Sequence, residues 1–159
     1  MPEVKGVIHA PQRATQLRDY SGLLFGNITP TDIDGLIEYK NIGYVIIELK
    51  YRDTEILKGQ KLALARMNDD FELAGKASLC IIASHFQEDC SKAIDVANTH
   101  VTAYRYRKRW RTFRSVMFTR DLIIRFFKSD EIKRREVKNG NRKQINNQSR
   151  GHSHTRQTK

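Results

Sequence analysis

The sequence predicts an α/β protein with a mixed central β-sheet flanked by helices and a disordered basic C-terminal tail. Apart from Glu48, residues 44–49 and 77–84 are largely apolar on both strand faces, which is typical of sheets covered on both sides. Segments with the apolar spacing of helices alternate with such runs. From Lys133 onward the chain is basic and rich in Asn, Gln, Ser and Gly, with too little apolar area to offset the entropy of ordering. We therefore expect one domain over residues 1–136 and a disordered tail over 137–159.

The first half of the domain should contain a helix and then three strands. Residues 11–19 ("PQRATQLRD") predict a short polar helix, with Pro11 in its first turn. The glycine-punctuated stretch "SGLLFGNITP" predicts a short strand and a turn. Two further strands, 33–39 and 43–51, are joined by the turn "KNIG". This connection is short enough for an antiparallel hairpin.

The second half continues with a helix, two strands and a last helix. The apolar spacing predicts a helix over residues 57–73, and residues 77–84 ("ASLCIIAS") predict a buried strand. Residues 101–110 alternate as a strand does. A final helix is expected over 119–127, with Thr119 as its N-cap residue and Asp121 in its first turn.

The charge of the chain points to a polyanionic partner. The formal net charge is +11, from 29 Lys and Arg against 18 Asp and Glu. Such an excess attracts nucleic acid or an acidic membrane surface, although a basic tail on an ordinary soluble protein has the same composition. No stretch is apolar over the length that a membrane span requires, and residues 1–10 contain no apolar segment of signal-peptide type.

The cysteine pattern predicts reduced thiols. Cys80 lies inside an apolar run and Cys90 is the only other cysteine, so a disulfide framework is not expected. His85, Cys90 and His100 lack the close spacing of zinc ligands. We expect a cytoplasmic protein, in the host cytoplasm if the chain is encoded by a phage.

Charged residues interrupt the strand that should be most apolar. Side chains two apart in a strand share a face, so Glu48 and Lys50 point the same way. If the hairpin pairs as its turn suggests, Asp34 comes beside both of them. Two carboxylates and the Leu49 carbonyl would form a site for a hard cation such as Mg²⁺. A solvated ion pair at a frayed strand end is the simpler interpretation of Glu48 and Lys50.

These residues resemble the motif of the PD-(D/E)XK nuclease superfamily. Residues 30–34 ("PTDID") correspond to its first half and residues 48–50 ("ELK") to its second half. Asp34 directly precedes the apolar strand and is the expected catalytic aspartate, with Asp32 as the alternative. Gln60, on the following helix, is placed like a glutamine that some members use at the site.

The resemblance implies a restriction-endonuclease-like core over residues 11–83, or as far as 110. It implies an Mg²⁺-dependent deoxyribonuclease, with Mn²⁺ able to substitute, that acts as an endonuclease and could be structure-specific. Asp34, Glu48 and the Leu49 carbonyl would bind the metal, Lys50 would orient water or offset charge, and Gln60 would assist. Small phage or mobile-element nucleases and Holliday junction resolvases are the most similar members. Resolvases act as homodimers, and an apolar helix could serve that purpose here: Ile123, Ile124, Phe126 and Phe127.

One departure from the superfamily leaves a second hypothesis open. Many members carry a glutamate on the first helix, where this chain has Gln12, Gln16 and Asp19, and the only earlier glutamate is Glu3. This departure favours chemistry with a single metal ion, or weak activity. The alternative is a nucleic-acid-binding protein on a nuclease fold that has lost catalysis.

A basic aromatic segment, "YRYRKRWRTFR", follows the core motif. Guanidinium groups bind phosphate in a bidentate manner and aromatic rings can stack on bases, so this segment predicts contacts with DNA. An edge strand with a charged outer face has the same pattern. The expected DNA-binding residues are Arg105, Arg107, Lys108, Arg109, Arg111 and Arg114.

Overall fold

The computed structural model describes residues 20–23, 28 and 30–151, and of residues 141–151 it describes only the backbone. The chain up to Asp32 and the chain from Ile33 onward form two units, and each is described by itself. In the first unit, Ser21–Leu23 forms a short 3-10 turn, η1. The helix expected over residues 11–19 lies outside the described residues, and so do residues 24–27 and 29 of the segment expected to form a strand and a turn.

The second unit contains a five-stranded mixed sheet with the strands in sequence order, β1-β2-β3-β4-β5. Strands β2 and β3 are parallel, and the other neighbouring strands are antiparallel. This confirms the expected α/β class with a mixed sheet. The strands are β1 (Gly35–Tyr39), β2 (Gly43–Tyr51), β3 (Ala77–His85), β4 (His100–Tyr106) and β5 (Arg109–Arg111).

The single strand expected over residues 101–110 is instead a hairpin of β4 and β5. Arg107 and Lys108 adopt the left-handed conformation, with φ of 50° and 61°. A residue with positive φ ends an extended strand, so the chain reverses here and the segment pairs with itself. Tyr106 therefore lies opposite Arg109, and Arg105 lies opposite Trp110.

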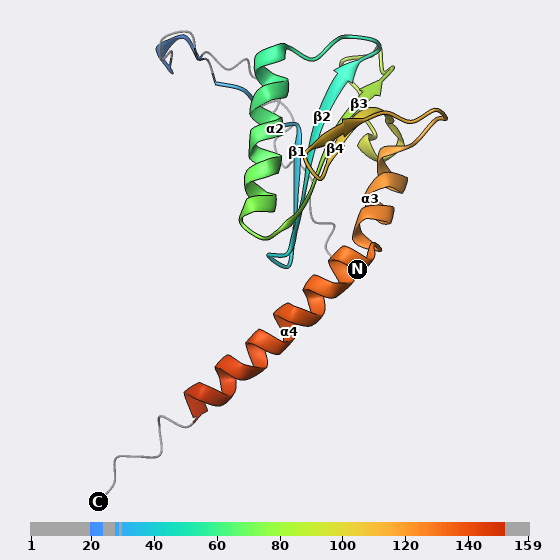
Figure 1. Ribbon diagram of the computed structural model, residues 1–159. Helices are drawn as coiled ribbons and strands as arrows, with labels where there is room; N and C mark the ends of the chain where they lie inside the picture. The colour runs from blue at the N-terminus through green and yellow to red at the C-terminus, as the bar shows by residue number, and fades with distance from the viewer. Residues whose placement is uncertain (1–19, 24–27, 29, 152–159) are drawn as a thin grey trace, which may run out of the picture. The chain divides into compact units, whose positions relative to one another are not determined.

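Helices cover both faces of the sheet (Figure 1). Helix α2 (Lys58–Leu73) lies on one face and connects β2 to β3, while α3 (Thr119–Phe127) packs on the other. Helix α4 (Asp130–Gly151) follows α3 directly, and Val96–Asn98 forms a 3-10 turn, η2, before β4. No helix among the residues described here has the length and apolar character needed to cross a membrane.

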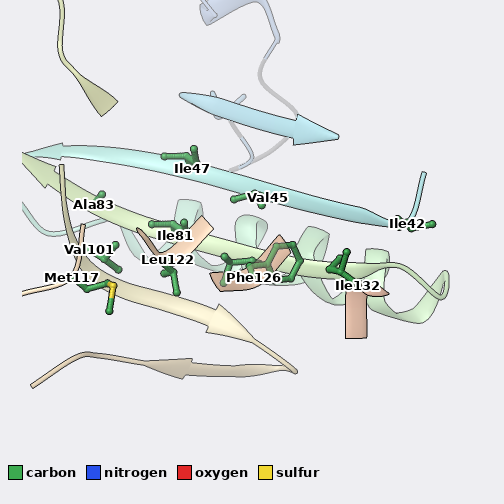
Figure 2. Close-up of a cluster of buried hydrophobic side chains, with 12 residues drawn as sticks. Ile42, Val45, Ile47, Ile81, Ala83, Val101, Met117, Leu122, Phe126 and Ile132 are labelled. Carbon is green, nitrogen blue, oxygen red and sulfur yellow. The ribbon is translucent and has the colours of Figure 1, made fainter. Parts of the chain in front are cut away.

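The larger core fills the space between the sheet and α3 (Figure 2). Odd-numbered residues of β2 point into it, including Val45 and Ile47, because alternate side chains of a strand share a face. Phe126 and Ile132 close it from the helical side. Thr119 is the first residue of α3 rather than its N-cap, and its hydroxyl is hydrogen-bonded to that of Thr99 at 2.8 Å.

The smaller core lies between the sheet and α2. Ile46 and Cys80 from the sheet pack against Leu64 of the helix, and the ring of Tyr44 stacks on that of Phe71 at 4.2 Å. Even-numbered residues of β2 therefore face α2. Glu48 and Lys50 belong to this series, so the charged end of β2 points toward the beginning of α2.

Helix α4 differs from the disorder expected after residue 136. Ile132, which is 1% exposed, anchors its first turns in the larger core. Glu136 accepts hydrogen bonds from the Tyr39 hydroxyl and the Lys40 amine, both at 2.8 Å, and the Asn139 amide donates to the Lys40 carbonyl. These contacts begin near the expected boundary of the domain and extend past it. The backbone stays helical to Gly151.

The apolar residues of α3 that were expected to serve a homodimer are mostly used within the chain. Phe126 is buried, and Ile123 and Phe127 pack against the larger core. Only Ile124 remains exposed, at 41%. The apolar face of α3 thus covers the sheet of its own chain.

Candidate active site

Glu48 is a buried carboxylate near the end of a central strand. It lies on β2 between β1 and β3, and only 3% of its surface is exposed. Gly35 of β1 pairs with Ile47, and Asp34 lies in the bend directly before Gly35, so the register brings Asp34 next to Glu48. This register agrees with the expectation that the two acids are neighbours, and their convergence on one cation stays a prediction.

Asp34 is held against β2 by the backbone of Leu49. The Leu49 N–H donates to Asp34 Oδ2 at 2.6 Å. This bond lies where the next backbone hydrogen bond between β1 and β2 would form if β1 continued. The N–H and the carbonyl of one strand residue point to the same side. The Leu49 carbonyl therefore lies on the Asp34 side of β2, as a metal ligand in this position would.

Lys50 and Gln60 complete the cluster. The Lys50 amine lies 2.7 Å from Glu48 Oε1 and donates to Gln60 Oε1 at 3.0 Å. The Gln60 amide nitrogen donates in turn to Glu48 Oε1 at 2.8 Å. Gln60 reaches this position because it lies in the first turn of α2, and a turn closed by the bond from the Thr54 N–H to the Tyr51 carbonyl precedes that helix.

One oxygen of Glu48 remains without a partner. Glu48 Oε2 is buried and makes no hydrogen bond with any described residue. Burial raises the pKa of Glu48, and the charge of Asp34 raises it further, while hydrogen bonds from Lys50 and Gln60 act in the opposite direction. A buried acceptor beside a second carboxylate is costly unless a donor or a cation meets it.

This set of donors fits a hard divalent cation. Asp34 and Glu48 supply carboxylate oxygens and Leu49 supplies a carbonyl, which are the ligands that Mg²⁺ accepts, with water filling its other positions. No cluster of three or more His, Cys, Asp or Glu side chains occurs within the described part of the chain. The candidate centre therefore rests on two carboxylates. The first-helix residues discussed above (Glu3, Gln12, Gln16 and Asp19) lie outside the described residues, and Asp32 belongs to the unit described separately.

The basic aromatic segment does not gather around this site. Arg105 lies on the α2 face, but it is bound to Asp69 of α2 at 2.9 and 2.7 Å, so its guanidinium is already paired. Arg107 pairs with Glu131 at 3.3 Å. Each of these two arginines already has an acidic partner within the chain, which the sequence pattern did not predict.

The remaining members of the segment point elsewhere. Arg109 and Arg111 lie opposite Tyr106 and Tyr104, whose rings pack toward Phe126 and Phe113 on the α3 face. The face of the sheet that carries Glu48 is the other one. Lys108 at the hairpin turn and Arg114 after β5 are exposed.

Sequence reasoning missed a group of basic residues beside the site. A pocket of about 500 Å³ adjoins Lys50, and Arg52, Lys58 and Lys61 are also among its lining residues. Lys58 and Lys61 flank Gln60 at the start of α2. Their spacing on either side of a candidate site residue was a signal present in the sequence.

Comparison of the chain with family models, with curated proteins and with solved structures finds no match.

Proposed function

We propose that the protein is an Mg²⁺-dependent deoxyribonuclease of the PD-(D/E)XK type that hydrolyses phosphodiester bonds, as an endonuclease and on structured DNA. The observation that carries this proposal is the buried Glu48 carboxylate, whose Oε2 has no partner among the described residues and whose pKa is raised by the nearby charge of Asp34 as well as by burial. Lys50 and Gln60 bind the other oxygen of the same carboxylate. A metal ion would satisfy the orphan oxygen and offset the repulsion between the two acids.

A solvated ion pair at a frayed strand end does not describe this arrangement. Glu48 is 3% exposed, and the pairing of β2 with β3 continues beyond it to Tyr51 and His85. The bond from the Arg52 N–H to the His85 carbonyl, at 2.8 Å, extends this pairing further. Burying a carboxylate in an ordered strand costs stability, and a functional site is the usual reason for such a cost.

The topology agrees with a restriction-endonuclease-like core. An antiparallel hairpin, β1–β2, carries Asp34 and Glu48, and helix α2 then crosses to the parallel strand β3. This is the arrangement that the resemblance implies for the part of the core that follows the first strand. This topology supports the proposal, but the main support comes from the positions of the individual site residues.

Each residue has a defined task in the proposed reaction. Asp34, Glu48 and the Leu49 carbonyl would hold the ion at the end of β2. When bound, Mg²⁺ lowers the pKa of a coordinated water and stabilises charge that develops at phosphorus. Lys50 would orient the attacking water and offset negative charge, and Gln60 would hold the Lys50 amine in place, as its 3.0 Å hydrogen bond does here.

The direct test is cleavage of duplex, single-stranded and branched DNA with Mg²⁺ or Mn²⁺, with EDTA as the control. Asp34→Asn and Glu48→Gln keep the shape of the side chain but remove a negative ligand, so metal binding and cleavage should both collapse. Lys50→Ala should retain metal binding and lose about a hundred- to a thousandfold in rate, as removal of one preorganised group commonly does. Asp32→Asn is the matched control and should be milder.

Two results would contradict the proposal in different ways. If the wild type and every variant are inert on all three substrates while DNA binding persists, the protein is a nucleic-acid-binding protein that has lost catalysis. If cleavage survives Glu48→Gln undiminished, the protein is a nuclease whose site lies elsewhere. Circular dichroism and thermal unfolding separate a lost ligand from a misfolded variant, and calorimetry shows which folded variants still bind metal.

A further inference from the structure

The pocket beside Lys50 lies where the end of β2 meets the beginning of α2. The segment 52–56 forms one side, the first turns of α2 form another, and Ile82 of β3 with Thr102 and Ala103 of β4 forms the floor. A register shift between Ile82 and Ala83 interrupts the pairing of β3 with β4 here. Such an irregularity bends the strand and increases its twist locally, next to the site.

Positive charge predominates in the lining of this pocket. Its basic residues are Lys50, Arg52, Lys58 and Lys61, and its acidic residues are Asp53 and Glu55. Within the part of the chain that the structure describes, neither lysine of α2 makes an ion pair. The Lys61 ammonium lies over the ring of Trp110, 5.1 Å from its centroid, and a ring face occupies only one side of the group, so its N–H donors on the other side can still bind an anion.

The first turn of α2 adds hydrogen-bond donors to the same place. Leu57 is the N-cap residue and makes no side-chain capping bond, and the first turn contains no acidic residue. The backbone N–H groups at the start of a helix have no partner within it, and they favour negative charge. A cluster of basic side chains and a set of uncapped N–H groups therefore meet at one pocket.

Lys50 connects this pocket with the candidate metal centre. It lines the pocket, and its amine lies 2.7 Å from Glu48. An anion in the pocket would lie next to any phosphate held at Asp34 and Glu48. A polynucleotide carries phosphates at regular intervals along its backbone, so one strand can occupy both positions at once.

We infer that this pocket binds a backbone phosphate of the DNA strand next to the phosphate that is cleaved, with Lys58 and Lys61 as its ligands. The inference deepens the proposed function and rests on it for the identity of the cleaved phosphate. It assigns DNA to the α2 face of the sheet. The arginines Arg109 and Arg111 of β5, which the sequence favoured, lie on the α3 face and do not take part.

The test measures binding in EDTA, where no cleavage can occur. Fluorescence anisotropy with a labelled duplex gives the dissociation constant at several salt concentrations. Each phosphate contact made by a lysine contributes about one unit to the slope of log K against log salt. The double variant Lys58→Gln and Lys61→Gln should therefore flatten the slope by about two units, while its thermal unfolding stays close to that of the wild type.

Two further double variants remove the same charge from other places. Arg125→Gln with Lys128→Gln changes exposed residues at the end of α3 and should leave the slope unchanged. Arg109→Gln with Arg111→Gln tests the β5 arginines and should also leave it unchanged. An equal loss in all three double variants would show a diffuse effect of net charge and would overturn the inference, as would a loss confined to the β5 variant.

Inorganic phosphate distinguishes a DNA phosphate from a small free anion. If millimolar phosphate stabilises the wild type but not the Lys58 and Lys61 variant, and DNA binding is equal in both, the pocket is a small-anion site and the inference fails. The outcome of the DNA-binding experiment does not depend on whether the protein cleaves DNA. A flattened slope in a protein that never cleaves would support the pocket and reject the enzyme.

Discussion

The docking of α4 on the sheet can be tested at one glycine. Gly43 begins β2, and a Cβ atom added there would lie 2.9 Å from Ile132 Cδ1, with ring atoms of Phe126 and Phe127 at 3.7 and 3.8 Å. Ile132 is 1% exposed and cannot move freely. Overpacking of this kind costs about 1–3 kcal/mol. The gain from replacing a strand glycine offsets about 0.5–1 kcal/mol of it, so Gly43→Ala should lower the free energy of unfolding by about 1 kcal/mol.

The companion variant removes the atom that clashes. Ile132→Val lacks Cδ1 and should by itself cost about 0.5–1.5 kcal/mol. Combined with Gly43→Ala it should relieve the contact, so the double variant should be more stable than the sum of the single changes predicts, by about 1 kcal/mol. Urea unfolding, followed by circular dichroism, measures the wild type, both single variants and the double variant.

A matched glycine shows whether the coupling is specific. A Cβ atom at Gly59 of α2 would meet nothing within 4 Å, so Gly59→Ala should combine additively with Ile132→Val. If Gly43→Ala and Ile132→Val are also additive within about 0.5 kcal/mol, Ile132 does not pack on Gly43 and our account of α4 is wrong.

Three further predictions concern charge, thiols and the tail. The hydrogen bond from Arg105 lowers the pKa of Asp69 in the folded protein below its ordinary value of 3.8. The pair therefore stabilises the fold above about pH 3.8, and this stabilisation is lost as the pH falls through the lower pKa that Asp69 has in the folded state. Asp69→Asn should therefore cost about 1–2 kcal/mol at pH 7, and the difference from the wild type in urea unfolding should shrink below pH 3.8. If the difference in stability between Asp69→Asn and the wild type does not change with pH, the ion pair does not stabilise the fold in this way. With a thiol reagent at pH 8, exposed Cys90 should react at once and Cys80 only after unfolding, because burial raises the pKa of Cys80 to about 12; equal rates would contradict this. Truncation after Gly140 keeps every described contact of α4 and should leave the unfolding midpoint unchanged while flattening the salt dependence of DNA binding; failure to fold would show that residues 141–159 are part of the domain.

The local pattern of apolar residues and turns determined much of the secondary structure of this protein. The hairpin, the helix over residues 119–127 and the strand over 43–51 could be read from apolar spacing and a short turn. The structure has the helix and this strand at these bounds, while the first strand of the hairpin begins at Gly35 instead of Ile33. The meeting of Asp34 with Glu48 followed from the two-residue period of strands and from the length of one turn. Such features depend on residues close together in sequence, and a single sequence contains that information.

Tertiary packing decided the rest. Arg105 of β4 is bound to Asp69 of α2, 36 residues away along the chain, and no local pattern distinguishes a paired arginine from a free one. The docking of Ile132 on Gly43, and the pocket in which Lys58 and Lys61 meet Lys50, likewise bring together distant segments. A side chain's neighbours across the fold depend on how whole elements pack, because burial and pairing are set by surfaces that only the folded chain brings into contact.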